Sequence, residues 1–409
     1  MILVCKYWKD TLIPNLSFQY YLIENKRDLN LLNGLKNRYG RDCFDFKVIE
    51  LTRVASRLLL QDSDISTTVT PLVTKYQTLN PMDLVSKFTN VNSLVLIVDD
   101  SNSGDINGTI MLLRSNTKSL QKLVDLDIRF SHLPLGTLDL RNTIDELPNL
   151  ESLKCTYFKD LTPMSSSILP LNFSNKSVSR LFLKKMKITC RNIQDLLNRT
   201  KTLTHLTITN LLESDMDAIL VSLTSTNKTI TYLSLELNTS NSVDCTLVRN
   251  LLLKNKVLQT CLLFAKLNPP SLQQPLPESL TLNDTLTDLS IYNFEMISIK
   301  FSKLVQLSIN STIQSVDRIM ESLESPSLKS LSLFYSSQST STKPLIDLLN
   351  RFEYLQTLIL KGSNSTWNDI INSLKDKSLQ LNYLIPDTCI SPITLLPPKQ
   401  LIQYYQECK

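Results

Sequence analysis

Glycine and histidine are both scarce in this sequence of 409 residues, which contains 6 glycines and 2 histidines. The few glycines form no Gly-rich phosphate or dinucleotide loop. His132 and His205 belong to no Cys/His, Ser/His/Asp or HExxH arrangement. The sequence therefore predicts no catalytic residue, no cofactor and no metal site, and we expect a protein that is not an enzyme.

Long hydrophobic runs are absent as well. No window approaches the length of a transmembrane helix, and Lys6 interrupts an N-terminal apolar stretch that is too short for a signal-peptide core. The eight cysteines are scattered without a CxxC pair, which fits a reducing compartment. We therefore expect a cytoplasmic protein, with the nucleus as the alternative compartment, and no membrane partner.

The net charge of +5 is small for a chain of this length. Nucleic-acid-binding proteins usually concentrate basic charge on one face. The densest basic run is the short segment 180–187, which the sequence favours as a solvated strand and turn. We therefore expect no nucleic-acid partner.

Leucine is abundant, and it recurs in an L-x-x-L-x-L motif. We call the second apolar residue of each copy its anchor. Most successive anchors are 24 to 28 residues apart, within the range of about 20–29 residues that is typical of leucine-based repeats. The anchors are Leu94, Leu126, Leu153, Leu181, Leu206, Leu233, Cys261, Leu289, Leu307, Leu331, Leu358 and Leu384.

Each motif predicts a short strand, because residues two apart share one face of a strand. Leu206 and Ile208 then point into the core, and His205 points outward. Segments between motifs, such as 192–200 and 244–255, have the periodicity of helices. Strands stack more closely than helices do, so the strand side is concave. We predict an α/β solenoid, a horseshoe or arc with parallel strands on the concave face and helices on the convex face.

The pattern over 90–386 resembles the helix-containing class of leucine-rich repeats, as in ribonuclease-inhibitor-like proteins. In that class an Asn or Cys usually follows the anchor by five residues. Here Asn238 fits, but other residues stand at most equivalent positions, so we expect irregular turns. We also expect the 18-residue interval before Leu307 to hold a loop.

The segment from Leu3 to Leu16 resembles the C-terminal half of an F-box, the motif that docks on the Skp1 adaptor of cullin ubiquitin ligases. The resemblance implies Leu3, Val4 and Trp8 as an adaptor-docking remnant. The preceding half of the motif is missing, so either the chain is truncated or the remnant no longer docks. The alternative is that Val4, Trp8 and Leu12 form one helix face that caps the solenoid.

These observations predict four parts of the chain. Residues 1–20 are the F-box-like helical segment, and 21–89 are a divergent cap or irregular repeat that includes a strand at 44–51. Residues 90–386 are the leucine-rich-repeat array, and 387–409 are a C-terminal cap.

The concave face of a solenoid is its usual binding surface, and aromatic and Arg residues are enriched at interface hot spots. We expect Phe182, His205, Tyr232, Phe264 and Tyr292 to form one aromatic row there, with flanking cations that favour a partner of acidic character. Other large outward residues are Arg129, Arg141, Lys154 and Lys361. The predicted protein-binding residues are Arg180, Phe182, Lys184, His205, Tyr232, Glu236, Phe264, Tyr292 and Phe334.

The sequence therefore predicts a non-catalytic scaffold, itself a monomer, that binds a protein partner. Together with the F-box resemblance, it indicates a substrate-receptor subunit of a cullin-type ubiquitin ligase, whose partners would be a Skp1-like adaptor and a cullin. The alternative is a leucine-rich-repeat regulator or inhibitor of another enzyme, such as a GTPase regulator, with no ubiquitin role.

Overall fold

A computed structural model shows two compact units, Met1–Ile208 and Thr209–Lys409. The predicted bounds 1–20, 21–89, 90–386 and 387–409 stay a prediction. Leu3, Val4 and Trp8 lie outside the described residues. The structure describes 21–23, 49–51, 71–76, 92–98, 113–114, 117–118, 120–130, 140–157, 174–185, 190–211, 213–237, 242–268, 281–292, 299–310, 327–334, 347, 351–352, 354–361 and 383–386.

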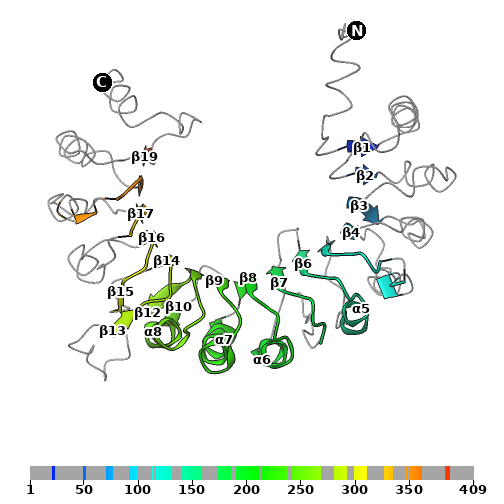
Figure 1. Cartoon of the computed structure of the whole chain (residues 1–409), viewed down its shortest axis with the longest axis horizontal. Coiled ribbons are helices and arrows are strands. Elements are labelled where there is room, and N and C mark those ends of the chain that lie inside the picture. The colour runs from blue at the N-terminus through cyan, green and yellow to red at the C-terminus, as the bar shows by residue number, and fades with distance from the viewer. Residues whose placement is uncertain are drawn as a thin grey trace, which may run out of the picture. The chain divides into compact units, whose positions relative to one another are not determined.

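The first unit is built on a parallel sheet in which spatial order follows chain order from β1 to β8 (Figure 1). Strand β2 lies within the segment 44–51 that was expected to form a strand. The helices are α5 (Arg141–Asp145) and α6 (Cys190–Arg199). The strands are β1 (Tyr21–Ile23), β2 (Ile49–Leu51), β3 (Pro71–Tyr76), β4 (Ser93–Val98), β5 (Asp125–Phe130), β6 (Ser152–Tyr157), β7 (Arg180–Lys184) and β8 (His205–Leu211), the last of which begins in this unit and ends in the second.

The second unit has the same design. Its sheet has the order β9-β11-β14-β16-β17-β18-β19, and β10–β12 and β13–β15 form small parallel pairs. Helices α7 (Glu213–Thr226) and α8 (Cys245–Lys254) pack against each other. The strands are β9 (Tyr232–Leu237), β10 (Ser242–Asp244), β11 (Thr260–Phe264), β12 (Lys266–Asn268), β13 (Thr281–Asn283), β14 (Asp288–Tyr292), β15 (Ile299–Phe301), β16 (Gln306–Asn310), β17 (Ser330–Phe334), β18 (Thr357–Lys361) and β19 (Tyr383–Pro386).

The predicted α/β class with an open, parallel sheet is therefore confirmed. Helices α6 and α8 lie in the segments 192–200 and 244–255 that were expected to be helical, within one or two residues of their bounds. Asp244 caps α8, since its carboxylate accepts a hydrogen bond of 2.8 Å from the Thr246 amide. The interval before Leu307, expected to be a loop, contains β15.

Alternation of buried and exposed residues along the strands shows how the core forms. In β5, Leu126, Ile128 and Phe130 are each 1% exposed, whereas the residues between them are partly exposed. The anchors from Leu94 to Leu358 are all buried, with at most 2% of their surface exposed. The sequence-based assignment of the anchors to the core is confirmed.

One backbone pattern repeats at the entry to the strands in both units. The carbonyl of Val124 accepts hydrogen bonds from the amides of Glu151 and Ser152, at 2.8 and 2.9 Å. In the second unit the carbonyl of Thr231 accepts from Gln259 and Thr260 at the same two distances. Equivalent carbonyl and amide groups therefore satisfy one another from repeat to repeat, so each copy of the motif enters its strand in the same way.

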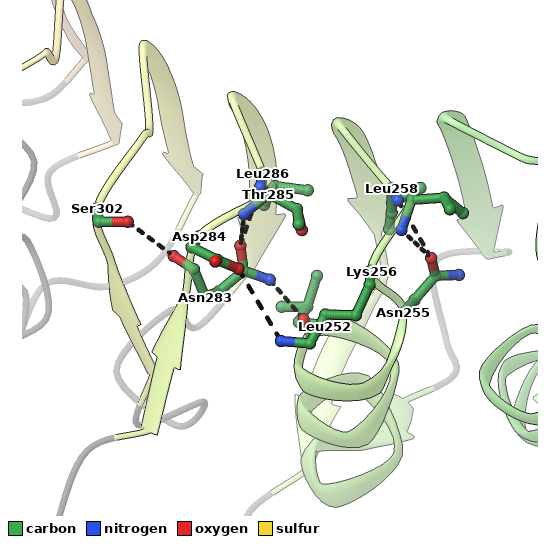
Figure 2. A network of polar contacts seen from close by, with 10 residues as sticks. Leu252, Asn255, Lys256, Leu258, Asn283, Asp284, Thr285, Leu286 and Ser302 are labelled. Carbon is green, nitrogen blue, oxygen red and sulfur yellow. Dashed lines mark hydrogen bonds and ion pairs between the residues drawn. The ribbon is translucent and has the colours of Figure 1, made fainter.

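A buried asparagine fixes the turn before several strands. Asn283 is 1% exposed; its Oδ1 accepts from the amides of Thr285 and Leu286, and its Nδ2 donates to the carbonyl of Leu252 in the preceding repeat (Figure 2). In each described case the asparagine stands three residues before the first apolar residue of the motif. The set consists of the buried Asn175, Asn255 and Asn283 and the partly exposed Asn227.

This position differs from the one expected from the resemblance, which was five residues after the anchor. Asn238, the residue that fitted that expectation, lies outside the described residues. The observed asparagines satisfy amide groups where the chain turns into the strand, rather than where it leaves it. The signal is visible in the sequence as an Asn-x-x-apolar pattern.

Arg141 was expected to point outward from a strand, and this is wrong. It is the first residue of helix α5, whose N-cap is Leu140.

Two apolar positions of the repeated motif carry cysteine in place of leucine or isoleucine. Cys155 and Cys261 are free thiols with none of their surface exposed, and burial raises the pKa of both to about 12. For Cys155 the nearby charge of Asp127 acts in the same direction.

We expect neither thiol to react with iodoacetamide in the folded protein, because the reactive thiolate is not populated below such a pKa. Mass spectrometry after labelling at mildly alkaline pH would follow each cysteine, with urea-unfolded protein as the control in which both react. Rapid labelling of Cys155 or Cys261 in the folded protein would contradict their placement in the core.

Candidate protein-binding surface

The outward side of strands β5 to β7 forms a charged surface, which we call the first-unit strand face. Strand register places Asp127, Lys154 and Phe182 in one row across the three strands. The next row toward the carboxyl ends holds Arg129, Thr156 and Lys184. The face comprises Asp125, Asp127, Arg129, Lys154, Thr156, Arg180, Phe182 and Lys184.

Ion pairs connect the strands of this face. Asp127 Oδ2 lies 2.9 Å from Arg129 Nη2 and 3.6 Å from Lys154 Nζ. Arg180 Nη2 lies 3.6 Å from Asp125 Oδ1 and 3.8 Å from Glu151 Oε2. The cationic side chains are 41–45% exposed, so solvent screens these pairs and each adds little to stability. The ion pairs determine which charged side chains of this face remain available to a partner.

His205 adjoins this face at the start of β8. Its Nδ1 lies 2.8 Å from the hydroxyl of Thr204. Burial lowers the pKa of His205 below its ordinary value of 6.5, and the positive charge of Arg180 lowers it further. The imidazole is therefore neutral near pH 7.

A depressed pKa in the folded state means that protonation of His205 favours unfolding. The stabilising effect of the neutral ring is present above the unfolded-state pKa and is lost as pH falls through the lower, folded-state value. We expect wild type to lose more melting temperature between about pH 7.5 and pH 5 than His205→Gln does. Thermal melts followed by circular dichroism would measure both; equal losses would show that His205 contributes nothing to acid sensitivity.

The second-unit strand face differs in character. Register aligns Tyr232 with Thr260 and Asp288, and aligns Ser234 with Leu262 and Ser290. Uncharged side chains dominate this face. Phe264, which is 38% exposed, is its clearest exposed aromatic residue among those described. We define the face by Tyr232, Ser234, Glu236, Thr260, Leu262, Phe264, Asp288 and Ser290.

The expected single aromatic row is wrong. Phe264 is aligned with Glu236 and not with Tyr232, because Tyr232 begins its strand whereas Phe264 ends its own. Tyr292 and Phe334 also end their strands, and the backbone register aligns both with Asn310. The side chains of Tyr292, Phe334 and Lys361 lie outside the described residues. Phe182 and His205 belong to the first unit.

A shallow groove of about 710 Å³ runs along the amino-terminal ends of β5 to β7, and no sequence pattern had indicated it. Its polar side chains already serve the turns: Asn149 Nδ2 donates to the carbonyl of Gln121, and the Thr202 hydroxyl donates to that of Val178. The groove is therefore a weaker candidate than the strand faces. Its lining residues are Lys122, Val124, Asn149, Glu151, Ser177, Ser179 and Thr202.

Membrane-spanning helices and metal-binding clusters are both absent from the described ranges. No helix among them is long and apolar enough to cross a membrane. Within the same ranges, no three His, Cys, Asp or Glu side chains are grouped so that they could hold a metal ion.

Comparison with known proteins does not assign the chain to a family. No protein-family model matches the chain, and no curated protein is similar to it in sequence. Among solved structures, the chain is similar to a Bacteroides fragilis protein solved by the Northeast Structural Genomics Consortium. The identity is 10% and the TM-score 0.35, over 80% of this chain and 77% of that chain. A TM-score at this level supports no statement about function.

Proposed function

We propose that this protein is a non-catalytic scaffold of the leucine-rich-repeat type, which binds a protein partner on the outward side of its strands. One observation carries the proposal. Consecutive strands bury an identical pattern of apolar residues, yet their outward positions hold large charged and aromatic side chains that are partly exposed. Solenoids use such extended strand surfaces for recognition.

The sharper form of the proposal is a substrate receptor of a cullin-type ubiquitin ligase. Its support is the resemblance of the segment Leu3–Leu16 to the C-terminal half of an F-box. The alternative is a repeat protein that regulates or inhibits another enzyme, such as a GTPase. Affinity purification of the full chain, scored for Skp1-like and cullin subunits, separates the two. Recovery that disappears in Leu3→Asp/Trp8→Asp supports the receptor; an enzyme recovered without these subunits supports the regulator.

Removal of aromatic side chains from the strand faces tests the binding surface itself. We expect Phe182→Ala/Tyr232→Ala/Phe264→Ala to lower partner recovery at least about tenfold, since a central interface aromatic typically contributes about 2 kcal/mol. Quantitative mass spectrometry of purified complexes measures the change. Separate Phe182→Ala and Tyr232→Ala/Phe264→Ala proteins assign the loss to the first or second unit.

A matched control removes exposed apolar side chains from elsewhere. Val221, Leu282 and Tyr354 are 49%, 47% and 58% exposed and stand outside both strand faces. We expect Val221→Ala/Leu282→Ala/Tyr354→Ala to leave recovery unchanged. If the control triple loses the partner and the strand-face triple keeps it, the binding surface has been misassigned.

A further inference from the structure

The two halves of the first-unit strand face carry opposite charge. At the amino-terminal ends of the strands, Arg180 lies beside two carboxylates, those of Asp125 and Glu151. Toward the carboxyl-terminal ends, three cations accompany one carboxylate. We call this second region the basic end, and it comprises Asp127, Arg129, Lys154, Thr156, Phe182 and Lys184.

Ion pairing leaves net positive charge at the basic end. Arg180 is compensated by two carboxylates, at 3.6 and 3.8 Å. The Asp127 carboxylate alone serves both Arg129 and Lys154. Lys184 is exposed, and no ion pair joins it to another residue of the described ranges. The cations suited to a partner are therefore Lys184 and Lys154 and not Arg180, which the sequence had favoured together with Lys184.

A hydroxyl group stands at the centre of these cations. Thr156 lies between Arg129 and Lys184 in the strand register. Its Oγ1 is buried and has no hydrogen-bond partner among the described residues. Because this oxygen is buried, a partner does not contact it, and Thr156 is an uncharged position between the two cations. The cations on both sides make a carboxylate the group that fits this row best.

We propose that an acidic segment of the protein partner lies across the carboxyl-terminal ends of β5, β6 and β7. Its carboxylates approach Lys184, Lys154 and Arg129, and an apolar side chain packs on Phe182. Neighbouring strands are about 4.8 Å apart, so Arg129 and Lys184 are about 10 Å apart, and acidic residues about three positions apart in an extended segment match them. This inference rests on the proposed function and adds the partner's chemistry.

Charge reversal at the basic end tests the inference. The probe is a fluorescein-labelled peptide of ten glutamates, and its fluorescence anisotropy measures binding to the full chain. We expect Lys154→Glu/Lys184→Glu to weaken binding at least about tenfold, and added salt to weaken wild-type binding. Should the double variant fail to fold, Lys154→Gln/Lys184→Gln is expected to weaken binding about fivefold.

The matched control makes an equal change of net charge in the second unit. Lys228 and Lys329 are exposed residues of the second unit, and we expect Lys228→Glu/Lys329→Glu to change peptide affinity less than about twofold. Equal losses of peptide affinity in both double variants would show that overall charge, and not the basic end, determines binding. This result would overturn the inference. Failure of wild type to bind the peptide would overturn it too.

A single-stranded oligonucleotide of ten thymidines distinguishes protein from nucleic acid. If the oligonucleotide binds more tightly than the peptide and Lys154→Glu/Lys184→Glu abolishes that binding, the basic end is a nucleic-acid surface. This result would refute the acidic protein segment. The proposed function has a separate readout, the recovery of partners by the strand-face triple variant. If that recovery falls while the glutamate peptide does not bind, only the acidic chemistry is wrong.

Discussion

Leu233→Asp is expected to unfold the second unit around β9. Leu233 is 1% exposed and lies between buried neighbours on β11 and its own strand. A carboxylate placed there has no cationic partner, and burying an unpaired charge costs several kcal/mol or more. Because repeats are stabilised mainly by their neighbours, the damage should spread to β11 and helix α7. Circular dichroism melts and hydrogen exchange would show the loss and its extent.

Leu262→Asp is the matched control, because it makes the same change on the next strand but on the outward side. Leu262 is partly exposed and belongs to the second-unit strand face. We expect a cost of at most about 1 kcal/mol, as is usual for partly exposed positions. Either of two results would show that the orientation assigned to these strands is wrong. One is a melting curve of Leu233→Asp that matches wild type, and the other is a large loss of stability in Leu262→Asp.

The anchors and the orientation of the strands could be predicted because both depend on local geometry. Side chains alternate strictly between the two sides of a strand. Once one apolar residue of the motif is placed in the core, the side on which every other residue of that strand lies is known. Leu206 and Leu233 were assigned to the core from this argument, and both are buried. The cap of α8 depends on equally local geometry, since an Asp just before an apolar helical pattern is a typical N-cap.

The prediction of a single aromatic row was wrong because the side to which a side chain points does not give its row in the sheet. Tyr232 stands one residue before its anchor and Phe182 one residue after its own, whereas Phe264 stands three after. Residues at different offsets point to the same side yet lie in different rows of the sheet. The offsets were present in the sequence, so the rows could have been predicted by counting from each anchor.

Pairing of charges on the first-unit strand face was not predictable in the same way. Arg180 has two acidic neighbours, one two strands away and one in a turn. The resulting charge depends on side-chain conformations and on which carboxylate each cation reaches. The sequence identified Arg180 and Lys184 as equivalent, and only the three-dimensional arrangement separates a compensated cation from an uncompensated one.

The asparagine turns show how polar side chains hold the repeats together. Asn255 and Asn283 occupy equivalent positions, and each accepts two amide hydrogen bonds with Oδ1. They differ at Nδ2. Asn283 donates to the Leu252 carbonyl, whereas Nδ2 of Asn255 has no hydrogen-bond partner among the described residues (Figure 2). Of these two residues, only Asn283 therefore uses its side chain to connect two repeats.

This difference predicts unequal effects of the same substitution. Replacement by aspartate keeps the Oδ1 acceptor and exchanges the amide donor for a second carboxylate oxygen. In Asn283→Asp that oxygen faces the Leu252 carbonyl, so a hydrogen bond becomes a repulsion inside the fold. In Asn255→Asp the donor that is lost has no partner. Both variants bury a carboxylate, at sites that are 1% and 3% exposed in wild type, so this cost largely cancels between them.

We expect Asn283→Asp to lower the free energy of unfolding by about 1–3 kcal/mol more than Asn255→Asp does. Urea unfolding of both proteins, followed by circular dichroism at a pH above the carboxylate pKa, gives the difference. The gap should narrow at low pH, because the carboxyl group of the Asn283→Asp variant is then protonated and can donate a hydrogen bond to the Leu252 carbonyl, as the amide does in wild type. Equal destabilisation at neutral pH would mean that the Leu252 contact contributes nothing, and that the repeats are held by the buried leucines and backbone hydrogen bonds alone.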